Sequence, residues 1–248
     1  AAYPRDHGLK SKIDAKKSTS SKKHPDKLKN AQHLKNNYAF TGEVFLGHLR
    51  YGTYGGNSIE NCHPFLRQNN WMTKNVVVAG NFNLTNVDEL FGLLVELGQH
   101  PKEKADTVTV MEKIGHFLDE EVTELYQDCK NSGLSKREAS PVIADRLNVA
   151  KILKKASRGW DGGYAMAGLF GHGDAFVLRD PAGIRPAYFY EDDEVVVVAS
   201  ERPVIQTVFN VAFDQIHELT PGYALIIRKS GQTKLSQIHQ PLPRKSCS

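Results

Sequence analysis

The sequence contains no long apolar run and little cysteine, and these absences exclude several classes of protein. No window of 18 consecutive apolar residues occurs, so the sequence predicts no helix that would span a bilayer. The N-terminal residues lack the apolar core of a secretory signal peptide. The three cysteines, Cys62, Cys129 and Cys247, are too few and too widely spaced for a disulfide framework or a zinc site. A reducing, cytoplasmic compartment is therefore expected.

Positive charge is concentrated at the N-terminal end of the chain. The formal net charge is +4, but it is unevenly distributed. Residues 1–40 contain ten Lys or Arg and three Asp, whereas the remaining residues contain 22 Lys or Arg and 25 Asp or Glu. Because this stretch is rich in Ser, Lys and Asn, we expect residues 1–40 to be a solvated, partly mobile arm. Contact of the arm with nucleic acid is the less favoured reading, because no aromatic residue is interleaved with its central lysines.

Beyond residue 40 the hydrophobic pattern favours strands, then helices, then strands again. Apolar residues three and four positions apart indicate the helices, and short apolar runs between turn signals indicate the strands. This order favours one layered α+β domain over residues 41–248, in which helices cover sheets and the later strands form an antiparallel meander. The predicted strands are 43–49, 76–79, 164–170, 175–179, 187–190, 195–199, 213–219 and 223–228, and the predicted helices are 87–97, 106–132, 141–156 and 203–209.

Polar residues follow the first two predicted strands and begin the longest predicted helix. Arg50 and Thr53 follow the first strand, Asn81 and the amide of Phe82 follow the second, and Asp106 starts the helix. A guanidinium suits an α-carboxylate, and a carboxylate suits an α-ammonium. An asparagine beside a backbone N–H is typical of an oxyanion hole. These groups would bind an amino acid and stabilise a tetrahedral intermediate at its side-chain carbonyl, although purely structural roles for them stay open.

Other chemical signals in the sequence are weak. Gly171-His172-Gly173 lacks the strand–turn–helix setting of a dinucleotide-binding loop. We interpret His48 and His172 as structural, because the histidines do not recur at metal-ligand spacings. Cys62 and His63 are adjacent in a segment expected to be extended, where neighbouring side chains point to opposite faces, so they are not expected to form a catalytic pair.

Five segments, in their order along the chain, resemble those of the class II glutamine amidotransferases. The resemblance spans residues 41–248, and the long segment Arg-Asp-Pro-Ala-Gly-Ile-Arg-Pro is most similar to the amidophosphoribosyltransferase branch of that family. It implies an Ntn-hydrolase fold, a four-layer αββα sandwich that is incomplete at its N-terminus. The segments are 47–53, 80–86, 105–107, 179–186 and 199–201.

The resemblance also implies roles for individual residues. Arg50, Thr53 and Asp106 match positions that bind glutamine, and Asn81 with the Phe82 amide matches the oxyanion hole. The family usually has glycine where Phe82 stands, but a backbone N–H can serve from either residue. The family's nucleophile is an N-terminal cysteine whose own α-amino group acts as the base. This chain begins with Ala1, and none of its three cysteines is expected to replace that nucleophile.

We therefore expect the chain to be part of a longer protein and to be inactive alone. The resemblance implies a parent that hydrolyses L-glutamine and passes the ammonia to phosphoribosyl pyrophosphate, the first step of purine synthesis. It implies Mg²⁺ and a phosphoribosyltransferase domain in that parent, with no cofactor in this chain; a homo-oligomer is expected, and iron–sulfur clusters occur in parts of the family. The alternatives are a non-catalytic glutamine-binding or regulatory module, or an amidotransferase with another acceptor.

Overall fold

The structure, a computed structural model, describes residues 25–49, 62–99 and 105–243. The chain divides into two compact units, residues 1–45 and residues 46–248. The first unit contains helix α2 (Pro25–Asn37), where the sequence analysis expects no regular element. The Thr41 hydroxyl donates to the carbonyls of Leu34 and Tyr38 and so ties the following turn to the end of this helix. The more basic part of the predicted arm, before residue 25, lies outside the described residues.

The predicted strand at 43–49 is wrong. Within the described residues this segment pairs with no strand, and the Leu49 side chain is fully exposed. A different segment, β1 (Phe65–Arg67), pairs with β2 (Val76–Leu84) and forms one edge of the sheet. An apolar run becomes a strand only where a partner offers backbone hydrogen bonds, and hydrophobicity alone does not reveal that partner.

The larger sheet is antiparallel throughout and has the order β1-β2-β3-β4-β8-β9. Its central pair is long: all nine residues of β2 pair with β3, from Val76 opposite Phe170 to Leu84 opposite Gly162. Strand β9 was not predicted. The remaining strands of this sheet are β3 (Gly162–Phe170), β4 (Ala175–Arg179), β8 (Tyr223–Ile227) and β9 (Thr233–Gln237).

The smaller sheet has three antiparallel strands in the order β6-β5-β7 and corrects the predicted meander. The chain leaves the larger sheet after β4, builds the smaller sheet, and returns as β8, which pairs with β4. Only two residues of the predicted strand 213–219 pair, because a 3-10 turn, η3 (Phe213–Gln215), occupies its first half. The strands are β5 (Tyr188–Glu191), β6 (Val196–Ala199) and β7 (His217–Glu218).

The helices between β2 and β3 follow the predictions, with one correction. The segment predicted as a single helix over 141–156 is divided between α5 (Lys136–Arg146) and α6 (Val149–Ala156). Ser135 and Glu138 form a capping box at the start of α5, and the Asn148 side chain accepts from the Lys151 N–H at the start of α6. Two capping signals therefore define two helices. The other helices here are α3 (Val87–Glu96) and α4 (Asp106–Asn131).

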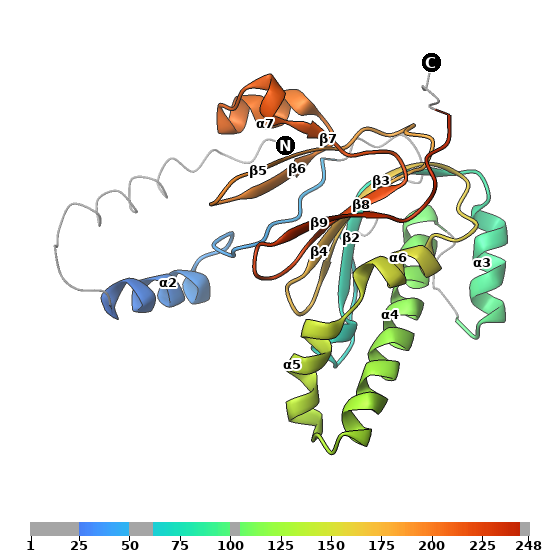
Figure 1. Cartoon of the computed structure of the whole chain (residues 1–248), viewed down its shortest axis with the longest axis horizontal. Helices are drawn as coiled ribbons and strands as arrows, with labels where there is room; N and C mark the ends of the chain where they lie inside the picture. The colour runs from blue at the N-terminus through green and yellow to red at the C-terminus, as the bar shows by residue number, and fades with distance from the viewer. Residues whose placement is uncertain (1–24, 50–61, 100–104, 244–248) are drawn as a thin grey trace. The chain divides into compact units, whose positions relative to one another are not determined.

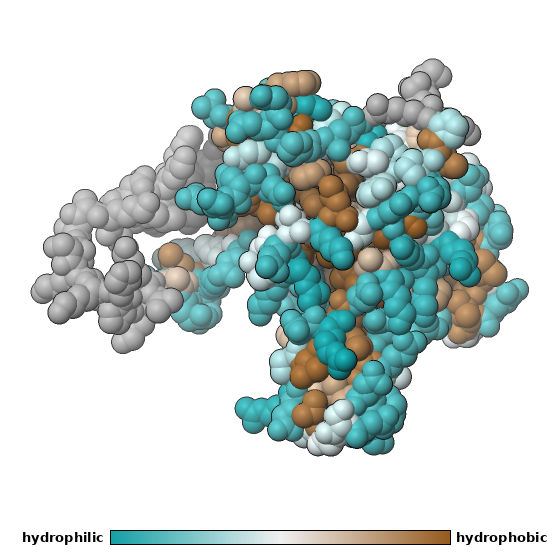
Figure 2. All heavy atoms as spheres, in the orientation of Figure 1, coloured by the Kyte–Doolittle hydropathy of each residue, from teal (hydrophilic) through white to brown (hydrophobic). Residues whose placement is uncertain are grey.

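The second unit contains the four predicted layers. Helices α3 to α6 cover one face of the larger sheet, the smaller sheet lies against the other face, and α7 (Arg202–Phe209) covers the smaller sheet (Figure 1). The αββα fold expected from the sequence is thus confirmed. Most of the viewed surface is hydrophilic, but apolar side chains gather over α3, where Leu93, Val95 and Leu97 are exposed (Figure 2). No helix in the described parts of the chain is long and apolar enough to cross a membrane.

Candidate functional site

Asn81 and Phe82 lie inside strand β2 rather than in a loop after it. The predicted strand ends at residue 79, but pairing with β3 continues, with Asn81 opposite Ala165 and Phe82 opposite Tyr164. The polar residues of 81–86 hid this continuation, since strand patterns are read from apolar runs. Both residues are consequently held by a regular ladder, which fixes their backbone direction more firmly than a loop would.

The ladder leaves the Phe82 N–H directed away from β3. In an antiparallel pair, opposite residues alternate between those that exchange backbone hydrogen bonds and those that do not. The Gly80 N–H points away from β3, because it donates to His63 Nδ1 at 3.2 Å. The Tyr164 carbonyl points to the other side of β3, since it accepts from the Asp180 N–H at 2.8 Å. Phe82, two residues after Gly80 and opposite Tyr164, therefore directs its N–H toward the β1 side of the sheet.

The side chains of Asn81 and Phe82 point to opposite faces of the sheet. The Phe82 ring is half-buried and packs on the core beneath the helices, beside the buried Tyr164. Burial and the Asp180 carboxylate raise the pKa of the Tyr164 phenol well above its usual range, so this neighbour is uncharged. Asn81 is exposed on the face that carries its partner Ala165. The Phe82 ring therefore extends away from the face that carries the Asn81 side chain.

Asp106 stands where the sequence places it, in the first turn of α4. The helix begins at Asp106, whose side chain is half-buried, and Gly133 with φ +80° follows its end as predicted. The next residue, Thr107, is buried, and its Oγ1 lies 3.3 Å from His63 Nε2. The start of α4 is thereby linked through one imidazole to the segment of β2 that contains Asn81 and Phe82.

His63 links the elements of this candidate site, and no pattern in the sequence indicates that role. Its ring stacks on His48 with centroids 4.4 Å apart, and lies 5.0 Å from the Phe65 ring and 5.9 Å from the Phe82 ring. Its hydrogen-bonding partners are 17 and 44 positions away in the chain, so no local pattern could reveal them. His48 contributes stacking, in agreement with its predicted structural role.

The predicted glutamine-binding residues Arg50 and Thr53 lie outside the described residues. The structure does place His48, two positions before Arg50, against His63. Among the cysteines, Cys129 is 2% exposed within the core of the helical layer, as predicted, and Cys62 is exposed. Cys247 also lies outside the described residues. In the described ranges, no group of three or more His, Cys, Asp or Glu residues could hold a metal ion.

The segment 179–186 forms a buried polar network behind the site. The Arg179 guanidinium is 1% exposed and donates to the carbonyls of Arg185, Leu219 and Gly183 and to the Glu218 carboxylate. The fully buried Asp180 accepts from the N–H groups of Tyr164, Ile184 and Arg185. These bonds turn the chain from β4 toward the smaller sheet and hold the end of β3 that faces Phe82.

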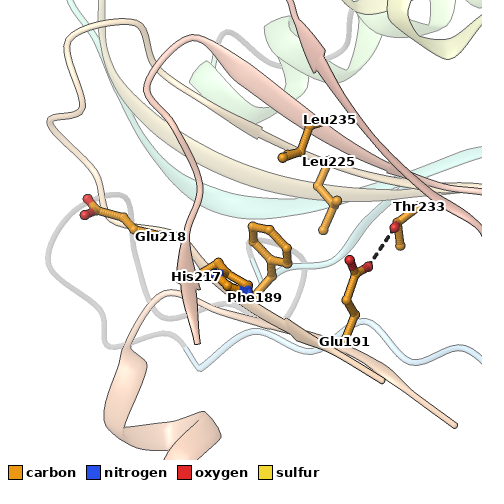
Figure 3. Close-up of a pocket in the computed structure, with 7 residues that line it drawn as sticks. All are labelled: Phe189, Glu191, His217, Glu218, Leu225, Thr233 and Leu235. Atoms are coloured by element: carbon orange, nitrogen blue, oxygen red, sulfur yellow. Dashed lines mark hydrogen bonds between the residues drawn. The ribbon is translucent and has the colours of Figure 1, made fainter. Parts of the chain in front are cut away.

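A cavity of about 550 Å³ elsewhere in the second unit contains none of the predicted site residues. It lies between β5 and β7 of the smaller sheet and β8 and β9 of the larger one (Figure 3). Its carboxylates already have donors from the chain, because Glu191 accepts from the Thr233 hydroxyl at 2.6 Å and Glu218 accepts from Arg179. Because the carboxylates of this cavity already have donors, we take the His63 region, where Gly80 and Thr107 meet one imidazole, as the candidate site.

Comparison with known proteins relates the chain to one group of enzymes. No family model matches it. The amidophosphoribosyltransferase of Escherichia coli K12 is 30% identical over 197 residues, which cover 77% of this chain and 34% of that protein. The Bacillus subtilis amidophosphoribosyltransferase is 28% identical over 210 residues, which cover 84% of this chain and 37% of that protein. The chain thus spans about a third of the length of the curated relatives it matches.

Solved structures agree with the sequence comparison. A B. subtilis glutamine phosphoribosylpyrophosphate amidotransferase complexed with ADP and GMP matches the fold with a TM-score of 0.55 and 24% identity. A structure described as the allosteric regulatory enzyme of purine biosynthesis matches with a TM-score of 0.57 and 25% identity. Both matches cover 81% of this chain and 36% of the other. In sequence and in fold, the chain is similar to about one third of an amidophosphoribosyltransferase.

Proposed function

We propose that this chain is the glutamine-binding part of an amidophosphoribosyltransferase-like enzyme. The observation that carries the proposal is the convergence, through His63, of the Gly80–Phe82 segment with the start of α4. That convergence supports the proposal that an oxyanion hole at Asn81 and Phe82 and an α-ammonium site at Asp106 belong to one glutamine site. The relationship to amidophosphoribosyltransferases supplies the reaction in which both are needed.

In the proposed reaction, glutamine binds with its α-ammonium at Asp106 and its α-carboxylate at Arg50, with Thr53 beside it. A cysteine thiolate attacks the side-chain carbonyl, and the oxygen takes up negative charge in the tetrahedral intermediate. The Asn81 amide and the Phe82 N–H donate to that oxygen. Collapse of the intermediate releases ammonia and leaves a thioester, which water hydrolyses to glutamate. The ammonia then reacts with phosphoribosyl pyrophosphate in another part of the parent enzyme.

The geometry of β2 supports two donors to one oxygen. The Asn81 side chain stands on one face of the strand, and the Phe82 N–H points sideways from it toward the β1 edge. An oxygen beside the strand on the Asn81 face can receive both. Removing one such donor typically lowers kcat by about 10²–10³. We assign the nucleophile to a cysteine of the longer parent protein, because Cys129 is buried in the core and neither Cys62 nor Cys247 is expected to take that role. A cytoplasmic location suits the reduced thiol this chemistry needs.

The proposal is tested first on the protein purified at its native length, established by intact mass and N-terminal sequencing. Expected results are ammonia and glutamate from L-glutamine, inactivation by a glutamine analogue that alkylates the nucleophile, and phosphoribosylamine when phosphoribosyl pyrophosphate is added. Glutamine binding without turnover would instead support the non-catalytic binding module. Absence of both binding and turnover would refute a glutamine site.

Asp106→Asn tests the recognition of the α-ammonium. Loss of a charged hydrogen bond of about 1.5–3 kcal/mol should weaken glutamine binding about 10- to 150-fold in calorimetric titration. Asp128→Asn, at the exposed other end of α4, is the matched control and should leave the affinity unchanged. Equal affinities for the wild type and Asp106→Asn would contradict the assignment of Asp106.

A further inference from the structure

We infer that His63 is a positioning residue that holds the oxyanion strand and the ammonium-binding helix in register, an inference that rests on the proposed function. The pairing of β1 with β2 places Phe65 opposite Val78, so residue 63 falls opposite Gly80. There the acceptor for the Gly80 N–H is the imidazole of His63. The hydrogen bonds along this edge of β2 therefore end at the His63 side chain, which binds the Gly80 N–H. The next N–H on the same edge of β2 is that of Phe82.

The hydrogen bonds define the state of the imidazole. Nδ1 accepts from the Gly80 N–H at 3.2 Å, so the neutral ring carries its proton on Nε2. That Nε2–H faces Thr107 Oγ1 at 3.3 Å, beside Asp106. One nitrogen thus restrains the strand of Asn81 and Phe82, and the other restrains the start of α4.

The surroundings of the ring hold it in place for both contacts. His48 stacks on it, the Phe65 ring meets it at an interplanar angle of 83°, and the Phe82 ring lies beyond. The ring is half-buried. A histidine held by aromatic neighbours loses little further freedom when it forms its two hydrogen bonds, which suits a positioning role.

Three substitutions separate the two contacts. Asparagine places an amide oxygen near Nδ1 and can keep the Gly80 bond, whereas glutamine places an amide nitrogen near Nε2 and can keep the Thr107 bond. Phenylalanine keeps the ring packing and loses both. His63→Phe should therefore lower kcat for glutamine hydrolysis about 100-fold and raise KM. His63→Asn should restore most of kcat, and His63→Gln should restore KM while kcat stays low.

The assays use the native-length protein, with His217→Phe, at the exposed position of strand β7, as the matched control. That control should keep the wild-type kcat and KM. Wild-type kinetics in His63→Phe would overturn the inference, as would an equal loss in all three His63 variants with matching falls in Tm, because that pattern indicates only lost folding stability.

A measurement independent of activity keeps the two proposals apart. Amide hydrogen exchange should show Gly80 protected in the wild type and in His63→Asn, and exchanging at least tenfold faster in His63→Phe. An inactive wild type with this exchange pattern would refute the proposed function and leave the positioning of β2 by His63 standing. An active wild type whose Gly80 protection is the same in His63→Phe would refute the positioning role alone.

Discussion

Replacing Gly80 with alanine should destabilise the protein, because there is no room for a methyl group between β2 and β3. A Cβ at this position would lie 2.5 Å from the Ala165 carbonyl oxygen and 2.7 Å from the Met166 Cα. These are backbone atoms, so the strand itself must move. Overpacking of this kind costs about 1–3 kcal/mol, and contact with backbone places Gly80→Ala at the upper end. The lower entropy of the unfolded alanine chain offsets about 0.5–1 kcal/mol of that cost.

The expected net loss is about 2 kcal/mol in the free energy of unfolding. With a urea dependence of about 2 kcal/mol per M, the unfolding midpoint should fall by about 1 M. Gly92→Ala is the matched control, since a Cβ there meets nothing within 4 Å and the residue lies inside helix α3. Helix propensity should make that variant more stable by about 1 kcal/mol. An unchanged midpoint for Gly80→Ala, beside a raised midpoint for Gly92→Ala, would refute the packing argument.

Two further predictions concern buried polar groups. Arg179→Met should lower the free energy of unfolding by about 3–5 kcal/mol, because it removes the buried donors to Glu218 and to three carbonyls. Denaturant unfolding measures this loss. The control, Lys154→Met on the exposed face of α6, should have little effect. Burial lowers the pKa of His239, whose Nε2 lies 2.6 Å from Ser157 Oγ. As the pH falls, His239 therefore takes up a proton in the unfolded chain before it does so in the folded protein, and the folded protein should lose stability below about pH 6.5. His239→Gln should show a shallower fall in Tm between about pH 7 and pH 5, and identical slopes would contradict the assignment.

Elements with a strong local pattern were predictable from the sequence. Helix α4 has a sustained apolar period and a closing glycine, and β4 is an apolar run between two turns, so both were located within a residue or two. The strand predicted at 43–49 failed because strand formation depends on a partner elsewhere in the chain. The division at Asn148 was missed because apolar periodicity continues across the boundary between α5 and α6.

In the candidate site too, residues with recognisable local chemistry could be predicted, whereas contacts between distant segments could not. Asn81, Phe82 and Asp106 carry recognisable chemistry, and their segments are brought together by His63. The role of His63 depends on the register between β1 and β2 and on the position at which α4 begins. Neither can be read from the residues next to His63 in the sequence. The ladder that extends β2 through Asn81 is likewise a property of the partner strand β3.

The return of the chain from the smaller sheet to β8 sets an order for folding. Strands β1 to β4 and helices α3 to α6 precede residue 180, so they can assemble while the rest of the chain is still being synthesised. Until residues 180–227 have been made, β4 has an open edge with the apolar side chains of Phe176 and Leu178 beside it. Such an edge can pair with another chain. Pairing with β8 therefore covers the open edge of β4 and removes one opportunity for aggregation during synthesis, after which β9 forms the outer edge of the larger sheet.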